Sequence, residues 1–236
     1  MSITRSLIDN STRWICAWNR GRRLKGWPGK DRLCLNLGCG LAVAKGWINI
    51  DGSLNALAAP WPEFVHKILY RFSGANRYYT EAEYCRLLGG HDFLHHDLAY
   101  GIPFSDNTVD FVYSSHFLEH LFRKDALTLL KESYRVLKPG GTVRVCIPDL
   151  QYAISLYTSG KKEKMLQDYF FVEDLESSLA RHKYMYDLEL LEAALRDAGF
   201  TGIEKLKYRE GKTPDLETLD NRPEDTLFVE AVKARH

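Results

Sequence analysis

The chain has 236 residues, of which 45% are hydrophobic and 27% are charged, a composition typical of soluble globular proteins. The 32 Lys and Arg residues and 31 Asp and Glu residues leave a formal net charge of +1, too small for binding nucleic acid through bulk charge. No segment approaches the ~20 apolar residues of a transmembrane helix, and the start lacks the apolar core of a secretion signal. The 5 cysteines contain no CxxC pair, which argues against a disulfide framework or a structural zinc site. A reduced, cytoplasmic protein is predicted.

Residues 1–32 form a basic amino-terminal arm in which Lys and Arg greatly outnumber Asp and Glu. Its apolar residues recur at helical spacing, with Leu7, Ile8, Trp14 and Ile15 on one stripe. We expect a helix that packs on the body and leaves its basic face in solvent. Peripheral contact with a membrane surface or another anionic partner is the alternative.

After the arm, short apolar runs alternate with helical patterns, which indicates a mostly parallel sheet covered by helices on both faces. The runs predicted as strands are Arg32–Leu37, Trp47–Asp51, Phe93–Asp97, Asp110–Ser115, Thr142–Ile147, Ile203–Tyr208 and Thr226–Val232. One helix carries Leu127, Leu130 and Tyr134 and is stopped at Lys138–Gly141, and another is capped by Asp187. Residues 33–236 are predicted to form a single domain with insertions at about 54–90 and 150–186.

The first predicted strand ends in the glycine turn Gly38–Gly40, at the edge of a parallel sheet where ligands bind. Asp51 ends the next strand, where a carboxylate can accept both hydroxyls of a ribose, and Asp97 ends the third. Ser115 and His116 follow the fourth strand. These strand ends predict a site of nucleoside shape. The third glycine of a GxGxxG turn is missing, which disfavours a nicotinamide dinucleotide.

Five motifs resemble, in order, those of the class I S-adenosylmethionine-dependent methyltransferases. They are Asn36–Gly40, Trp47–Asp51, Ile102–Asp106, Phe117–His120 and Arg135–Gly141. The sequence is most similar to the type 11 group, particularly to small bacterial members associated with surface-glycan or secondary metabolism. The resemblance implies a Rossmann-like, doubly wound α/β fold with seven strands, mostly parallel with an antiparallel last strand, and S-adenosylmethionine as the cofactor.

The same resemblance implies a set of cofactor-binding residues. They are Asn36, Gly38, Cys39, Gly40, Asp51, Gly52, Asp97, Leu98, Ser115 and His116. The glycine turn would lie beside the methionine part, Asp51 at the ribose, Asp97 and Leu98 at the adenine, and Ser115 with His116 near the sulfonium. Two structural alternatives stay open, since the glycines can simply form a turn and Asp97 can cap a helix.

Only residues 41–46 separate the glycine turn from the second strand, although a parallel crossover with its helix usually needs about ten to twelve residues. The first crossover helix is therefore expected to be a single turn or absent. The amino-terminal arm is expected to cover the sheet that this leaves exposed.

Methyl transfer to a hydroxyl acceptor needs a base, and histidine titrates in the useful range. The candidates for this role are His116, His120, His182 and Asp149. Tyr184, Tyr186 and Asp187 are predicted to bind the acceptor. Asp220 and Arg222 could also reach the pocket, although no local pattern requires it. We expect a small-molecule or glycan acceptor and no metal. The sequence leaves the oligomeric state open.

Three other functions compete with this reading. His116, Glu119 and His120 match the H-x-x-E-H signature of zinc peptidases, which would require the segment to be one helix with a third ligand downstream. A methyltransferase-like domain that binds a partner without turnover is the second alternative. A nicotinamide oxidoreductase is the third.

Overall fold

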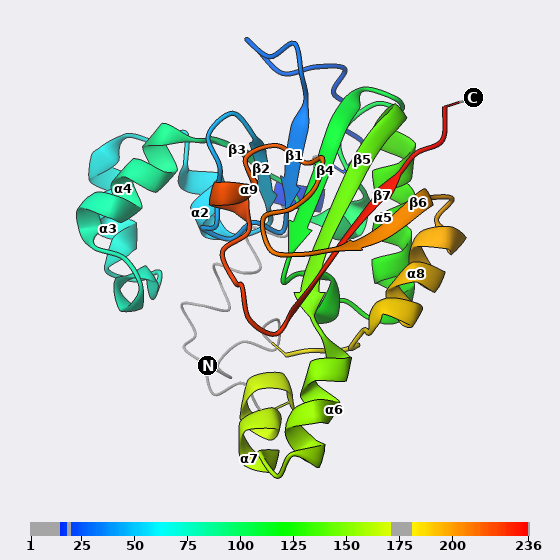
Figure 1. The fold of residues 1–236 in the computed structure, drawn as a ribbon. Coiled ribbons are helices and arrows are strands. Elements are labelled where there is room, and N and C mark those ends of the chain that lie inside the picture. The colour runs from blue at the N-terminus through cyan, green and yellow to red at the C-terminus, as the bar shows by residue number, and fades with distance from the viewer. Residues whose placement is uncertain (1–14, 18–19, 171–180, 236) are drawn as a thin grey trace.

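The structure is a computed structural model, and it describes residues 15–17, 20–170 and 181–235 (Figure 1). Most of the apolar stripe predicted for the arm, from Leu7 to Trp14, lies outside the described residues. Residues 15–17 are helical.

A seven-stranded sheet forms the centre of the molecule, with the strand order β3-β2-β1-β4-β5-β7-β6. Its strands are β1 (Cys34–Leu37), β2 (Ile48–Asp51), β3 (Asp92–His95), β4 (Val109–Ser115), β5 (Leu137–Pro148), β6 (Thr201–Leu206) and β7 (Thr226–Val232). β1 to β5 are mutually parallel, while β7 runs antiparallel to both β5 and β6. The predicted doubly wound sheet with an antiparallel last strand is confirmed, although β5 begins earlier than predicted because Leu137 already pairs with Val109.

Two helices cover one face of the sheet, namely α5 (Arg123–Val136) and α8 (Leu188–Asp197). Both carry apolar side chains at helical spacing, and these pack into the main core with side chains of the strands. α5 ends immediately before Leu137, whose backbone is extended, as the following Lys138-Pro139 sequence favours. The backbone N–H of Leu190 donates to the Asp187 carboxylate at 2.9 Å, which confirms the predicted helix cap.

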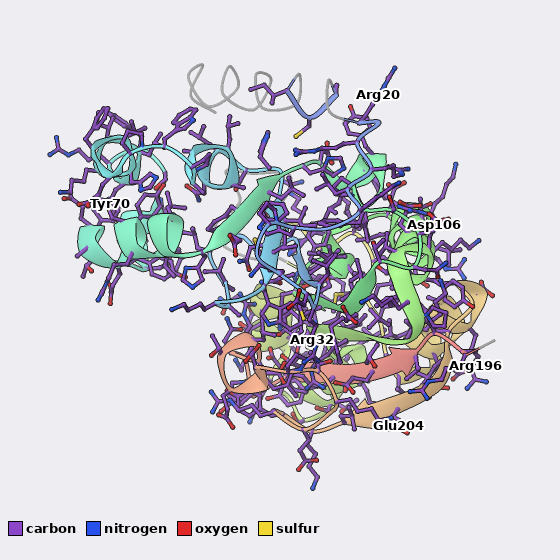
Figure 2. The ribbon with its side chains drawn as sticks, turned by 90° about the horizontal axis from the view of Figure 1, so that it is seen from above. Arg20, Arg32, Tyr70, Asp106, Arg196 and Glu204 are labelled. Atoms are coloured by element: carbon purple, nitrogen blue, oxygen red, sulfur yellow. The ribbon has the colours of Figure 1, made fainter. Side chains whose placement is uncertain are left out.

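The predicted insertion at 54–90 forms the crossover from β2 to β3. It contains α2 (Leu54–Ala58), α3 (Glu63–Tyr70), the 3-10 turn η1 (Ala75–Arg77) and α4 (Glu81–Gly90). α3 and α4 pack on each other and project beyond the β3 edge (Figure 1). Seen from above, Tyr70 at the end of α3 and Glu204 on β6 lie at opposite sides of the molecule (Figure 2).

The second predicted insertion, at 150–186, follows the carboxyl end of β5 (Figure 1). Its described elements are α6 (Leu150–Thr158), α7 (Lys162–Met165) and the π-helical turn η4 (Leu166–Phe170). Ala153, Leu156, Met165 and Tyr169 form a small apolar cluster of their own. No helix among the described residues has the length and the apolar character needed to cross a membrane.

The crossover from β1 to β2 contains no helix, as its length predicts, since residues 41–47 form turns and irregular backbone. Much of the arm lies outside the described residues, so its covering of this part of the sheet stays a prediction, although Lys30 Nζ donates to the Gly46 carbonyl at 2.7 Å. A carboxy-terminal segment lies on the same part of the sheet, because the Trp47 indole N–H donates to Asp215 at 2.9 Å and the Tyr113 hydroxyl donates to the Leu219 carbonyl at 2.8 Å. The segment includes the short helix α9 (Leu216–Leu219), beside β1 and β2 in Figure 1.

A fully buried ion pair ties this segment to the sheet. The Arg144 guanidinium on β5 lies 2.5 Å from the Asp220 carboxylate and 3.3 Å from Glu230 on β7. It also donates to the Glu210 carbonyl at 2.9 Å. Asp220 is thus engaged inside the protein, and the expectation that it reaches the substrate pocket is wrong.

Replacing Arg144 by Met is expected to destabilise the protein by about 3–5 kcal/mol, because the change leaves the Asp220 carboxylate buried without its partner. Urea unfolding followed by circular dichroism measures the loss. The matched control is Arg196→Met on α8 (Arg196 is labelled in Figure 2), which removes a side chain that is 68% exposed from its pair with Glu192. That control should cost about 0.3–0.5 kcal/mol, and equal effects of the two changes would contradict a structural role for the buried pair.

Candidate active site

The register of the parallel strands brings the predicted site residues to one edge of the sheet. Leu37 on β1 pairs with Ile50 on one side and with Ser114 on the other. Asp51 pairs with His95 at the end of β3. The glycine turn, Asp51, Asp97 and His116 therefore all follow strands that end at the same level, as predicted.

The glycine turn depends on two residues with left-handed backbone. Gly38 has φ +64°, and a Cβ atom there would lie 2.2 Å from the ring of Phe117. Gly40 has φ +51°, but a Cβ atom there would meet no other atom within 4 Å. Phe117 thus closes one side of the turn, while the space at Gly40 stays open.

Asp51 links the glycine turn to the start of the next helix. Its Oδ2 accepts a hydrogen bond from the Gly40 backbone N–H at 2.9 Å, and its Oδ1 accepts one from Ser53 N–H at 2.8 Å. Each carboxylate oxygen has two lone-pair sites, so one acceptor site remains on each oxygen. A carboxylate held in this way is suited to accept two hydroxyl groups of a ribose.

Asp97 has the structural role that the sequence left open. It follows β3 and caps the 3-10 turn η2 (Leu98–Tyr100), since its Oδ1 accepts from the Ala99 N–H at 2.9 Å. Its Cα lies 3.7 Å from the Cβ position of Gly52, next to Asp51. Capping occupies one carboxylate oxygen of Asp97. The contact of Asp97 with the adenine stays a prediction.

The described part of the arm reaches this edge. The Cys16 thiol is 1% exposed and lies 3.5 Å from Nε2 of His95. Burial and the nearby Asp97 and Asp51 carboxylates raise the pKa of Cys16 to about 11. Cys16 is therefore an uncharged packing residue beside the strand ends.

Asn36 and Cys39 are buried structural residues. Asn36 is 2% exposed, and its side-chain N–H group donates to the Ala42 carbonyl at 2.8 Å and to Asn49 at 3.0 Å. The N–H groups of the Asn36 side chain thus fix the loop after the glycine turn, and a contact of Asn36 with the cofactor stays a prediction. The Cys39 side chain is 7% exposed, and burial holds the pKa of its thiol well above the usual range.

A cluster of titratable side chains follows β4. His116 has left-handed backbone (φ +49°), and its Nδ1 lies 3.5 Å from Oε1 of Glu119. His120 Nε2 lies 3.9 Å from the same oxygen, and the rings of His120 and His182 are 5.1 Å apart. Burial lowers the pKa of His182, so its ring is neutral at neutral pH. Three of the four predicted bases are thus brought together.

Asp149, the fourth candidate base, lies at the end of β5 and caps α6 through a 2.9 Å hydrogen bond from Gln151 N–H. Its other oxygen lies 3.8 Å from Lys205 Nζ. The capping contact gives this carboxylate a structural role, and its service as a base stays a prediction.

The residues predicted to bind the acceptor separate into different environments. Tyr186 is 2% exposed inside the main core, so placing its ring against an acceptor is wrong. Tyr184 packs edge-on against it with ring centroids 4.9 Å apart. Asp187 caps α8. An acceptor contact of Tyr184 or Asp187 stays a prediction, as do the predicted cofactor contacts of Ser115, which ends β4, and Leu98, which packs against the main core.

The sequence analysis gave no role in a methyltransferase site to two side chains that the structure places there, Phe117 and Glu119. Phe117 belongs to one of the sequence motifs, but the sequence does not reveal its contact with Gly38. The two residues follow β1 and β4, which are far apart in the sequence. Glu119 is 1% exposed, and neither of its oxygens accepts a hydrogen bond from the described residues. For Glu119, the only indication in the sequence is that its carboxylate lies between the two histidines of a His-x-x-Glu-His segment.

The zinc-peptidase alternative fails on local geometry. Its signature requires the two histidines to lie one turn apart on an α-helix. Here His116 has a left-handed backbone, and only Leu118–His120 form a 3-10 turn, η3.

Comparison with known proteins gives a consistent result. Residues 51–145 match a family model described as a methyltransferase domain. Over 131 residues, the chain is 35% identical to a demethylmenaquinone methyltransferase of Geobacillus sp. (strain WCH70), a match covering 50% of this chain and 53% of the relative. The corresponding enzyme of Lactococcus lactis subsp. lactis (strain IL1403) is 33% identical over 146 residues, covering 56% of this chain and 54% of the relative. The chain thus spans about half the length of these relatives.

Solved structures share the fold over nearly the whole chain. A SAM-dependent methyltransferase from Archaeoglobus fulgidus has a TM-score of 0.50 at 16% identity, covering 97% of this chain and 94% of that one. A protein from Bordetella parapertussis described as a possible exported protein has a TM-score of 0.51 at 16% identity, covering 98% of this chain and 68% of that one. At this identity the likeness shows the fold alone.

The sheet order, the glycine turn and the acidic residue after β2 define a Rossmann-like fold of the methyltransferase class. The match over residues 51–145 identifies a methyltransferase domain in the chain, similar to the type 11 group of the class I S-adenosylmethionine-dependent methyltransferases.

Gly38→Ala and Gly40→Ala form a matched pair that tests the turn. Both force a side chain into the left-handed region at about 1–2 kcal/mol, but only Gly38→Ala also drives a Cβ atom into the Phe117 ring, adding about 1–3 kcal/mol. Urea unfolding of both variants measures the difference. Adding Phe117→Ala to each should remove the excess cost of Gly38→Ala, and an equal cost for the two glycine variants would show that the ring yields freely.

Proposed function

We propose that the protein binds S-adenosylmethionine at the ends of β1, β2 and β3 and transfers its methyl group to the oxygen of a small-molecule or glycan hydroxyl. The observation that supports this most is the pair of hydrogen bonds from Gly40 and Ser53 to Asp51, which hold the carboxylate in place with one acceptor site left on each oxygen. The bound cofactor would supply an already activated methyl group. The chain's own task is then to orient the acceptor, exclude water and take a proton from it.

The residues present fit this cofactor. The open space at Gly40 lets a ligand approach the backbone, and Asp51 offers acceptor atoms for two hydroxyl groups beside it. A phosphate-bearing ligand fits less well, because no helix follows the glycine turn to present its N-terminus to an anion. These features favour a nucleoside without phosphates over a dinucleotide.

The side chains after β4 support a hydroxyl acceptor. His116 is held in a left-handed backbone conformation, which places a titratable ring beside the strand ends at a cost in backbone strain. Its Nε2 lies 3.1 Å from the Thr226 hydroxyl, and its Nδ1 faces Glu119. The Thr226 hydroxyl already donates to the Glu224 carbonyl, so Nε2 carries the proton toward Thr226 and Nδ1 keeps the lone pair with which His116 would accept a proton from the substrate.

Demethylmenaquinone, named in the titles of the relatives, is the second candidate acceptor. The matches that carry this name cover only half of the chain. A comparison of demethylmenaquinol with phenolic and sugar hydroxyls as acceptors, measured as formation of S-adenosylhomocysteine, decides between the two. A cofactor that binds but is consumed with none of these acceptors would favour the non-catalytic alternative.

We propose that the protein acts in the cytoplasm, the location that its composition predicts. A peripheral membrane contact of the basic arm also stays a prediction.

Asp51→Asn is expected to weaken binding of S-adenosylhomocysteine by about 1–3 kcal/mol, roughly 5- to 150-fold, because charge-assisted hydrogen bonds to the ribose are lost. Isothermal titration calorimetry measures the affinity. The control is Asp149→Asn, which changes a carboxylate that caps α6. This variant should bind S-adenosylhomocysteine with unchanged affinity. An unaltered affinity in Asp51→Asn would remove this residue from the site.

His116→Ala is expected to lower the turnover of a hydroxyl acceptor by about 10²- to 10⁴-fold, the usual loss when a general base is removed. The affinity for S-adenosylhomocysteine should stay within a factor of about three, since the ring acts on the acceptor and the bulk of the cofactor contacts are made elsewhere. Initial rates and calorimetry on the same preparation measure the two effects. A variant that retains full turnover would exclude His116 as the base.

A further inference from the structure

Three potential metal ligands from two distant segments meet beside the end of β4. Glu119 and His120 belong to the turn η3, and His182 lies near the end of the second insertion, more than sixty residues later. One ligand atom from each of the three side chains lies within 4.8 Å of the other two. Two imidazoles and one carboxylate are a common donor set for divalent transition metals.

No Lys or Arg side chain among the described residues forms an ion pair with the Glu119 carboxylate. Its side chain is 1% exposed, and neither oxygen accepts a hydrogen bond from any group in the described residues. Among the described residues, the ring nitrogens that lie within 4 Å of Glu119 Oε1 are His116 Nδ1 at 3.5 Å and His120 Nε2 at 3.9 Å, both too distant for a good hydrogen bond. Buried carboxylates are normally paired or bound to a metal, so this environment calls for a cation.

Both histidines are oriented through Nδ1, which contacts a backbone carbonyl. Nδ1 of His182 lies 2.8 Å from the Tyr169 carbonyl, and Nδ1 of His120 lies 3.3 Å from the Arg181 carbonyl. A carbonyl oxygen can only accept, so each Nδ1 carries the proton and each Nε2 keeps its lone pair. A backbone carbonyl behind the ring is the usual support of a metal-binding histidine.

Backbone hydrogen bonds keep the two segments together. The Glu119 carbonyl accepts from Lys183 N–H at 2.7 Å and from Tyr184 N–H at 3.2 Å. These bonds come from the two residues that directly follow His182, and they hold this segment against η3 independently of any ligand. The donor set is therefore largely organised in advance.

We propose that Glu119, His120 and His182 bind one divalent transition-metal ion, of the kind represented by Zn²⁺, Fe²⁺ or Co²⁺. Coordination at about 2.0–2.2 Å brings ligand atoms to about 3–3.5 Å from one another, which small rotations of the side chains achieve from the 3.9 Å between His120 Nε2 and Glu119 Oε1. Three protein ligands leave open positions for water or an oxygen of a substrate.

This site differs from the zinc-peptidase signature in the same segment. That signature uses both histidines of H-x-x-E-H as ligands and the glutamate as a base. Here the glutamate is a ligand, and His182 takes the place of His116. A bound ion could hold an acceptor oxygen next to the cofactor, and this role rests on the proposed function. The binding of the ion itself does not depend on the proposed function.

Metal binding is tested on the full-length, tag-free protein after treatment with a chelator, without cofactor or acceptor. Titration with Zn²⁺ against a chromophoric chelator should show one equivalent bound. His120→Ala and Glu119→Gln should each weaken binding at least about 10-fold. The control is His91→Ala, which removes a histidine located just after α4 and should bind Zn²⁺ as the unaltered protein does.

Absorption of the Co²⁺-loaded protein gives a second readout, since ligand-field bands should appear and should be lost in His120→Ala. The His120 side chain is 24% exposed, so this variant is expected to fold, and its melting temperature without metal checks that it does. The proposal is overturned if the unaltered protein binds no stoichiometric metal, or if His120→Ala and His91→Ala bind it equally well. Failure on either count leaves the proposed cofactor site untouched, because calorimetry with S-adenosylhomocysteine tests that site separately.

Discussion

The position of β1 between β2 and β4 determines where every candidate functional group lies. Parallel pairing on both sides of β1 aligns the ends of these strands, so the glycine turn, Asp51 and His116 emerge at one level. Asp51 then ties the turn to β2, and the Phe117 ring ties it to the segment after β4. Because these contacts are made by groups that follow separate strands, the site exists only when the sheet is complete.

The short crossover after the glycine turn has a structural consequence far along the chain. Without a helix in residues 41–47, one face of the sheet near β1 needs another cover. The carboxy-terminal segment supplies it, and Arg144 holds that segment through buried contacts with Asp220 and Glu230. A buried guanidinium in the middle of a strand is costly unless it is fully paired, which explains why two carboxylates surround it.

The acceptor side is built differently from the cofactor side. The cofactor side consists of backbone turns and one anchored carboxylate, which suits a ligand of constant shape. The acceptor side combines η3 with residues from the end of the second insertion, and these bring three histidines around the buried Glu119. The insertion after β5 therefore supplies one functional group of this region, His182, together with the Tyr169 carbonyl that orients its ring.

Local patterns in the sequence were sufficient for much of the architecture. Alternating apolar runs, the glycine turn, the Asp187 cap and the short first crossover predicted the parallel sheet, its functional edge and the absent helix, because these features depend on neighbouring residues. Tertiary packing alone decided that Asn36 and Tyr186 are structural, that Asp220 pairs with Arg144, and that His182 joins Glu119 and His120. A side chain's role at such places is set by what lies opposite it across the sheet, and that neighbour comes from a part of the chain too distant for any local pattern to reveal.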